Sequence, residues 1–219
     1  MRTSTAAREE ILGRIRDALS GASTAVELSH ARIVRAYRRR GSLTSEALVA
    51  LFIDRLMDYD AEVVERKDAI EIPEAVLEVL RRAGEQRLLI PAEFPDEWLP
   101  QGIETERDDD LSIDKVNLAQ AVLTTCEAAV ASTGTIFLVH GSTQGRRVAT
   151  LLPDHHICLV RRNQIVELIS EGLAVVASTG GRTLTTISGP SATSDIEMTR
   201  IRGVHGPRRL TVLLYGSAD

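Results

Sequence analysis

Three segments in the second half of the chain combine glycine with hydroxyl groups or arginines, which are the residue types that hold a small anion. The first segment, residues 131–135, has the sequence ASTGT. In it, Gly134 lies between Thr133 and Thr135 and can expose backbone N–H groups and two hydroxyls together, which suits a carboxylate, a phosphate or a carbonyl oxygen. The alternative is a hairpin turn that simply requires a glycine.

The second segment, residues 140–147, contains two glycines and ends in two arginines. Gly145 belongs to a flexible loop, and Arg146 and Arg147 beside it could clamp an anion through paired hydrogen bonds. No Gly-Lys-Ser or Gly-Lys-Thr follows, so the segment is not a nucleotide-binding P-loop. A solvated loop is the alternative.

The third segment, residues 188–197, is rich in hydroxyl groups. Ser194 followed by Glu197 fits a capping box, which predicts a helix near residues 195–200. Capping needs one hydroxyl, yet four crowd this predicted helix N-terminus, where the helix dipole favours an anion. The candidate ligand-binding residues of this segment are Ser188, Gly189, Pro190, Ser191, Thr193, Ser194 and Asp195.

The histidines supply an acid–base candidate. His205 precedes Gly206 and Pro207 in a predicted turn, where it could act as a catalytic acid or base and Gly206 could contact the ligand. A purely structural role is the alternative. His155 and His156 point to opposite faces if the segment is a strand, so the two cannot share one metal ion. No local spacing of ligands supports a metal site, and we predict none.

Composition excludes several classes of protein. The 219 residues include 26 Lys and Arg against 31 Asp and Glu, a net charge of −5, and only 3% aromatic residues, which argues against nucleic-acid binding. Cys126 and Cys158 are too few for a four-cysteine zinc or iron–sulfur site, so no cofactor is expected in this chain. The sequence contains neither a signal peptide nor a membrane span, which predicts a cytoplasmic protein.

The elements that would position these residues fall into two parts. Residues 1–41 predict a helical appendage, because Ile11, Leu12, Ile15 and Leu19 recur at helical spacing. A second helix is predicted over about residues 26–39, where a run of arginines and Gly41 forms an ordinary stop signal.

Residues 42–216 alternate between helical and extended patterns, which predicts an α/β domain with a mostly parallel sheet. We expect the triplet 108–110 to be a solvated turn, and ligands to bind at the carboxyl ends of the strands. The predicted helices are 44–59, 72–83, 146–152, 164–173 and 195–200. The predicted strands are 61–66, 87–91, 128–132, 135–139, 157–160, 183–187 and 210–215.

Four motifs occur in an order that resembles the lactate-utilisation domain family, in its protein C branch. They are TGT at 133–135, GRR at 145–147 with LLP at 151–153, ISGPS at 187–191 with SDIE at 194–197, and GVHGP at 203–207. The resemblance covers about residues 42–216. It implies a three-layer α/β/α sandwich like that of ribose-5-phosphate isomerase and the CoA transferases.

The resemblance also implies a function. Members of this branch act in the oxidation of L-lactate to pyruvate beside two partner proteins that carry iron–sulfur clusters. We therefore expect a cluster-free component that binds a small anionic ligand, iron–sulfur partner subunits, or both. One alternative is a stand-alone enzyme of the CoA-transferase or sugar-phosphate isomerase kind, with Glu127 or Glu197 as the glutamate near the motifs. Another is a non-catalytic scaffold or regulatory subunit that docks through the arginines at 38–40.

Overall fold

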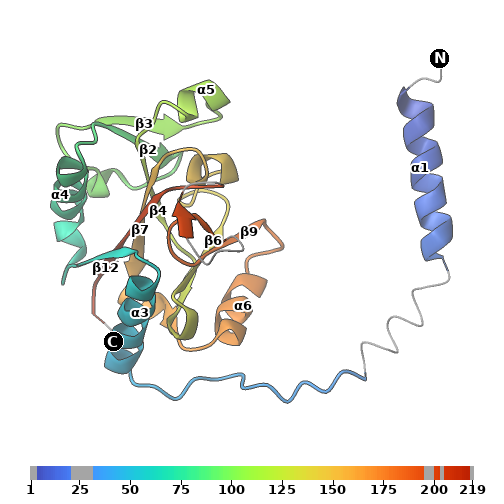
Figure 1. Cartoon of the computed structure of the whole chain (residues 1–219), viewed down its shortest axis with the longest axis horizontal. Coiled ribbons are helices and arrows are strands. Elements are labelled where there is room, and N and C mark those ends of the chain that lie inside the picture. The colour runs from blue at the N-terminus through green and yellow to red at the C-terminus, as the bar shows by residue number, and fades with distance from the viewer. Residues whose placement is uncertain (1–3, 21–31, 195–199, 203–204, 218–219) are drawn as a thin grey trace. The chain divides into compact units, whose positions relative to one another are not determined.

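The computed structural model describes residues 4–20, 32–194, 200–202 and 205–217, and the chain divides into two compact units, 1–37 and 38–219. The first unit contains helix α1 (Ser4–Leu19) (Figure 1). The helix predicted over 26–39 is wrong for residues 32–39, which are not helical, and its beginning lies outside the described residues. At the beginning of the second unit, hydrogen bonds to residues of α6 hold the chain: the Arg38 carbonyl accepts from the Ser170 hydroxyl, and the Gly41 N–H donates to the Glu171 carboxylate.

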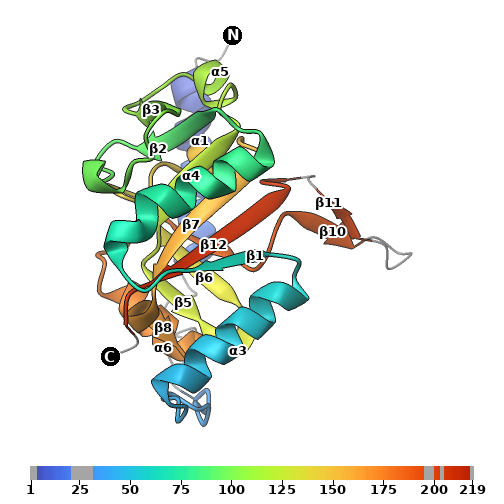
Figure 2. The ribbon, with the colours of Figure 1, turned by 90° about the vertical axis from the view of Figure 1, so that its left-hand side faces the viewer.

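The second unit is built on a sheet of six strands, all parallel, in the order β1-β12-β7-β4-β2-β3 (Figure 2). The prediction of a mostly parallel sheet is confirmed. The strands are β1 (Glu62–Glu65), β2 (Arg87–Pro91), β3 (Glu104–Asp108), β4 (Ala121–Thr125), β7 (His155–Arg161) and β12 (Arg209–Tyr215).

A second sheet, which the sequence patterns did not predict as such, has the order β8-β5-β6-β9. Its strands β5 and β9 run antiparallel to β6, whereas β5 and β8 are parallel. A separate two-stranded ribbon joins β10 to β11. The bounds are β5 (Ala128–Val130), β6 (Thr135–Val139), β8 (Ile165–Val166), β9 (Leu184–Ile187), β10 (Ala192–Ser194) and β11 (Arg200–Arg202).

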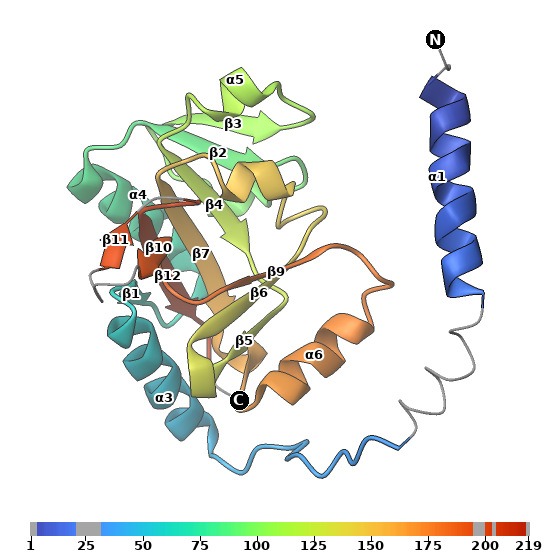
Figure 3. The same ribbon diagram turned by 45° about the vertical axis from the view of Figure 1, so that its right-hand side comes forward.

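Helices cover both sides of the main sheet. Helix α4 (Ile72–Ala83) packs Val76 and Leu80 against one face (Figure 2). On the other face, α3 (Ser45–Asp58) buries Phe52 and Leu56 together with residues of the second sheet. Helix α6 (Ile169–Ala177) lies on the outer side of the second sheet, and a short α5 (Ile113–Val116) follows β3 (Figure 3). The second sheet thus shares a layer with α3.

Local signals explain the helix bounds that the sequence predicted well. Thr44 caps α3 by accepting a hydrogen bond from the Ala47 N–H. Helix α4 has Pro73 in its first turn and ends at Gly84, whose φ of +69° is the left-handed conformation typical of a glycine stop. Within the described residues, no helix is both long and apolar enough to cross a membrane.

Tertiary pairing overrides the local signals elsewhere. Ser194 belongs to β10 and pairs with Arg200 of β11, so residue 200 is in a strand and not in the predicted helix; residues 195–199 of that predicted helix lie outside the described part. The helix predicted from residue 164 begins only at Ile169, because residues 165–166 pair with β5 as strand β8. The helix predicted over 146–152 is reduced to one 3-10 turn, η4 (Arg147–Thr150).

A buried polar chain ties β7 and β12 to the rest of the unit. His155 Nδ1 lies 2.8 Å from a Glu85 carboxylate oxygen, and its Nε2 lies 2.8 Å from Thr211 Oγ1, which donates to Glu62 at 2.9 Å. The two carboxylates also pair with Arg209 and Arg82 respectively. His155 therefore points toward the α4 side, whereas His156 contacts Thr124 on the opposite face, as alternation along a strand predicts.

This chain of contacts yields a stability prediction. The substitution Thr211→Val leaves the buried His155 Nε2 without its partner, so we expect the free energy of unfolding to fall by about 1–3 kcal/mol. Urea unfolding measures the change. Thr211→Ser is the control, since it keeps the hydroxyl and removes only a methyl group, at a cost of about 1 kcal/mol. Equal losses in the two variants would show that the hydroxyl contributes nothing.

Candidate functional site

An open pocket of about 320 Å³ gathers residues from two of the three candidate segments. Its walls are the loop after β9, the residues before β12 and turn η4, and its floor includes His156 and Leu210. Those two floor residues are the second residues of β7 and β12 and pair with each other. The predicted site residues that line this pocket are Arg147, Ser188, Gly189, Pro190, Ser191, His205 and Gly206.

The pocket lies at the amino ends of two parallel strands, not at the carboxyl ends where we expected a ligand site. The second sheet is the reason. Strand β9 runs antiparallel to β6, so the loop that follows its carboxyl end crosses toward the beginnings of β7 and β12. The expectation applies to a purely parallel sheet. Here the partly antiparallel second sheet places the hydroxyl-rich loop near the amino ends of β7 and β12 instead.

Glycine at position 189 is required by close packing. Gly189 has a φ of +80°, and a Cβ on it would lie 2.5 Å from the Cβ of Tyr59, just beyond the end of α3. The loop after β9 is therefore pressed against this helix end. The neighbouring Ser188 Oγ lies 2.8 Å from Thr135 Oγ1, which in turn lies 2.8 Å from Thr133 Oγ1.

The first candidate segment supports the pocket from behind. Thr135 is buried, and its hydroxyl links Thr133 to Ser188, but neither threonine lines the pocket. Gly134 has a φ of +59°, and a Cβ there would lie 3.0 Å from the backbone carbon of Arg55 in α3. This segment begins with the turn η3 (Ala131–Thr133) and contacts Ser188 through a row of hydroxyls.

The third candidate segment and the residues before β12 are joined directly. The Ser191 N–H donates to the Pro207 carbonyl at 2.8 Å, and the His205 N–H donates to Ser191 Oγ at 3.3 Å. His205 is exposed and stands at the rim. Thr193 and Ser194 belong to β10, and Asp195 lies outside the described residues.

The two adjacent arginines have different surroundings. Arg146 is held by Asp108, with Nε 3.0 Å from Oδ2, and it also contacts Asp110 and the Leu111 carbonyl. These carboxylates raise the pKa of Arg146, and the contact with Asp108 contributes most. Arg147 lines the pocket and forms no ion pair with any residue that the structure describes. Asp108 is buried, so the triplet 108–110 is not the fully solvated turn that we predicted.

Gly145 shapes the loop that carries these arginines. It adopts a φ of +71°, bridges to Gly141, and has Pro91 where a Cβ would point. Its carbonyl lies 3.0 Å from His140 Nδ1, while His140 Nε2 lies 2.6 Å from Thr185 Oγ1. The loop is therefore well supported, and Gly145 itself does not line the pocket.

His156 is a titratable pocket residue that the sequence analysis did not propose as part of the site. Its side chain is buried, and Nε2 lies 2.8 Å from Thr124 Oγ1. Its Nδ1 is the one buried side-chain nitrogen or oxygen in the described part of the chain that has no hydrogen-bond partner. Burial, and secondarily the charge of His155, lower the pKa of His156 to about 3, so the ring is neutral near pH 7. The only sequence signal was its alternation with His155.

The two remaining predictions concern metals and glutamates. Among the described residues, no group of three histidine, cysteine or carboxylate side chains is arranged to hold a metal ion. Glu127 accepts a hydrogen bond from Gln144 and does not line the pocket, and Glu197 lies outside the described residues.

Comparison with known proteins gives consistent matches. The family model of the LUD domain matches residues 49–215. A protein named Lactate utilization protein C from Deinococcus radiodurans is 42% identical over 213 residues, 96% of each chain, and one of the same name from Bacillus licheniformis is 28% identical over 75% of this chain and 76% of its own. The crystal structure of a DUF162 family protein from Deinococcus radiodurans has a TM-score of 0.70 at 40% identity, covering 80% of this chain and 100% of that one.

The packing of α3 against Gly134 yields a prediction. Gly134→Ala forces a side chain into a left-handed backbone position, at a cost of about 1–3 kcal/mol, and it also collides with the backbone of α3. Gly102→Ala is the matched control, because Gly102 has a φ of +77° but nothing within 4 Å of its Cβ position. In urea unfolding we expect Gly134→Ala to be the less stable variant, and a larger loss in Gly102→Ala would contradict the packing argument.

The lowered pKa of His156 yields a second prediction. The unfolded histidine binds a proton near pH 6.5, whereas the folded one does so only near pH 3, so the free energy of unfolding must fall as pH drops below about 6.5. Between pH 7 and pH 5 this group alone should lower it by about 2 kcal/mol. We expect His156→Gln to lose that part of the pH dependence in urea unfolding at the two pH values. An unchanged slope would place the pKa of His156 in its ordinary range.

Proposed function

The chain belongs to the LUD domain family, and we propose that it is a component of a lactate-utilisation system. In this proposal the chain itself carries no iron–sulfur cluster and binds a small carboxylate in the pocket around Arg147. The names of its relatives support the system, and the geometry of the pocket supports the ligand class. The pathway step in this proposal is the oxidation of L-lactate to pyruvate.

One observation carries the ligand class. Arg147 is a cation at a pocket wall without an ion pair to any described residue, whereas the adjacent Arg146 is fully engaged by carboxylates. Ser188, Ser191 and Gly206 line the same pocket. A guanidinium with nearby hydroxyl and backbone donors is the arrangement that binds a carboxylate, because charged hydrogen bonds are the strongest ones available.

The cysteine count supports the proposal that partner subunits perform the redox chemistry. The chain has two cysteines, and both are buried in the core beside α3. Two thiols fall short of the four that a self-contained cluster needs. We infer that this protein supplies ligand binding to iron–sulfur partners rather than an electron path of its own.

The scaffold alternative has less support. It relied on the arginines at 38–40 as a docking surface, but Arg38 pairs with Glu167 inside the same unit. Glu167 also accepts the N–H groups of Ser42 and Leu43, and these backbone hydrogen bonds are the main reason that the pKa of Glu167 is lowered. Arg38 thus helps to fix the beginning of the domain, and no described contact favours a partner at this place.

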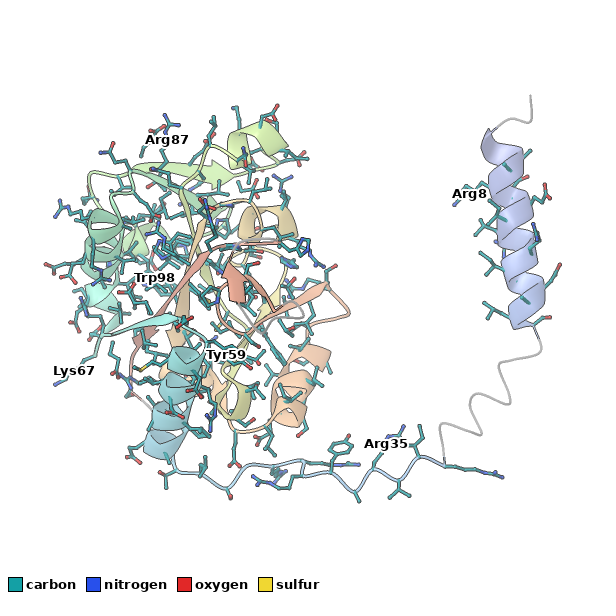
Figure 4. The ribbon with its side chains drawn as sticks, viewed as in Figure 1. Arg8, Arg35, Tyr59, Lys67, Arg87 and Trp98 are labelled. Carbon is teal, nitrogen blue, oxygen red and sulfur yellow. The ribbon has the colours of Figure 1, made fainter. Side chains whose placement is uncertain are left out.

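The proposal is tested by binding of L-lactate to the purified chain. We expect Arg147→Ala to weaken binding by about 1.5–3 kcal/mol, roughly 10- to 150-fold in Kd, because a charged hydrogen bond is lost. Isothermal titration calorimetry measures the change. Arg87→Ala is the control, since Arg87 pairs with the exposed Glu104 and lies well apart from Tyr59, which Gly189 of the pocket contacts (Figure 4). An unchanged affinity in Arg147→Ala would remove this residue from the site, and an absence of binding would overturn the ligand assignment.

A further inference from the structure

The Arg147 pocket is larger than a ligand of the size of lactate requires. Its volume is about 320 Å³. Pockets of roughly 300–1,000 Å³ are those that take drug-sized ligands, and their walls are mostly apolar with a few polar groups that fix the orientation. The apolar part of L-lactate is a single methyl group, so L-lactate would leave much of this space to water. The volume therefore indicates a ligand with a larger body.

Much of the pocket lining is apolar. The half-buried side chains of Leu151, Ile187, Pro190 and Pro207 line it, and the buried Leu210 lies at its floor. Apolar surface that a ligand removes from water contributes to binding in proportion to its area. An acid whose body is itself apolar gains this contribution, and a short acid gains little of it.

Leu151 is the apolar side chain that the core leaves to the pocket. It follows directly after turn η4, which begins with Arg147, and it is half-buried at the pocket. The next residue, Leu152, packs into the core with Leu89 and Ala149 instead. The two ends of η4 therefore bring a cation and an apolar side chain to the same pocket.

Several polar side chains of the lining already have partners within the protein. Ser188 Oγ lies 2.8 Å from Thr135 Oγ1, and Thr185 Oγ1 lies 2.6 Å from His140 Nε2. Polar groups that are already paired do not require a further polar group on the ligand. The lining therefore favours one charged contact, at Arg147, over a ligand that is polar along its whole length.

Gly206 keeps space open beside Leu151. A Cβ at residue 206 would lie 3.5 Å from Ser191 Cβ and 3.8 Å from Leu151 Cδ2, which are ordinary van der Waals distances. The backbone at Gly206 is not in the left-handed region, so neither its conformation nor its packing requires a glycine. The missing side chain leaves room that a ligand can occupy.

We propose that this pocket binds a monocarboxylate whose apolar body is longer than the methyl group of lactate. Arg147 binds the carboxylate, and the body lies against Leu151 in the space beside Gly206. This inference rests on the proposed carboxylate site and deepens it by assigning the rest of the ligand. L-Lactate is then a ligand of the pocket, but a weaker one than acids with a longer body.

The first experiment uses the unaltered chain, so its result does not depend on how a variant folds. Calorimetry gives the Kd values of L-lactate and of the straight-chain acids acetate, propionate, butyrate, pentanoate and hexanoate. We expect each added CH₂ group to tighten binding by about two- to fourfold until the space is filled. Hexanoate should bind about tenfold or more tightly than propionate, and L-lactate should resemble propionate.

Two variants locate the apolar contact. Gly206→Ala fills the open space, and Leu151→Ala removes apolar surface, so each should reduce the preference for hexanoate over propionate by about threefold or more. The affinity for propionate should change little. Gly13→Ala and Leu118→Ala are the matched controls, because Gly13 lies in α1 and Leu118 is an exposed leucine that does not line this pocket. Both controls should keep the full preference.

The other outcomes separate this inference from the proposed function. Kd values that do not change with chain length, but still depend on Arg147, would overturn the apolar body and leave the carboxylate site standing. A preference for hexanoate that persists in both Gly206→Ala and Leu151→Ala would place the contact elsewhere and overturn the inference. A preference that is present, with affinities that Arg147→Ala leaves unchanged, would overturn the carboxylate contact instead. No binding of any acid, L-lactate included, would overturn both.

Discussion

The close approach of helix α3 to two glycine turns is the constraint on which the site depends. Gly134 meets the backbone of this helix at Arg55, and Gly189 meets Tyr59 just beyond its end. A side chain at either position would push the second sheet away from α3. Because Thr135 and Ser188 follow and precede these glycines, the same packing sets the hydroxyl row that reaches the pocket. The position of the pocket residues thus depends on how closely the second sheet packs against α3.

Two pairs of identical neighbours divide their roles between scaffold and pocket. Arg146 is held by Asp108 at the end of β3, and Arg147 is left at the pocket wall. His155 completes a buried chain from Glu85 to Thr211, and His156 forms part of the pocket floor on the opposite face. In each pair, the structural member fixes the backbone from which the other projects. This arrangement places the cation of Arg147 and the neutral ring of His156 at one pocket.

The location of the pocket also follows from the combination of two sheets. A purely parallel sheet presents its loops and helix N-termini at the carboxyl ends of its strands. Here β9 belongs to the second sheet, and its loop is joined to the residues before β12 by the Ser191 to Pro207 hydrogen bond. The hydroxyl-rich loop therefore closes over the beginnings of β7 and β12. Its neighbours there are His156 and Leu210, which are far apart in the sequence and meet only because β7 and β12 pair.

The sequence by itself predicted a mostly parallel sheet, though not its strands β3 and β4, and it predicted the bounds of α3 and α4, the family, and two of the loops that line the pocket. Those features depend on periodicity, caps and motifs, which act over a few residues: Thr44, Pro73 and Gly84 mark helix ends wherever they occur in this pattern. Only the tertiary structure decided which arginine faces the pocket, why Ser194 is in a strand, and that His156 lies at the floor. The roles of the arginines and of His156 depend on partners distant in sequence, Asp108 and Thr124, and pairing at such separations leaves no local signal. Ser194 pairs with the nearby Arg200, but its capping-box pattern favoured a helix over this ribbon.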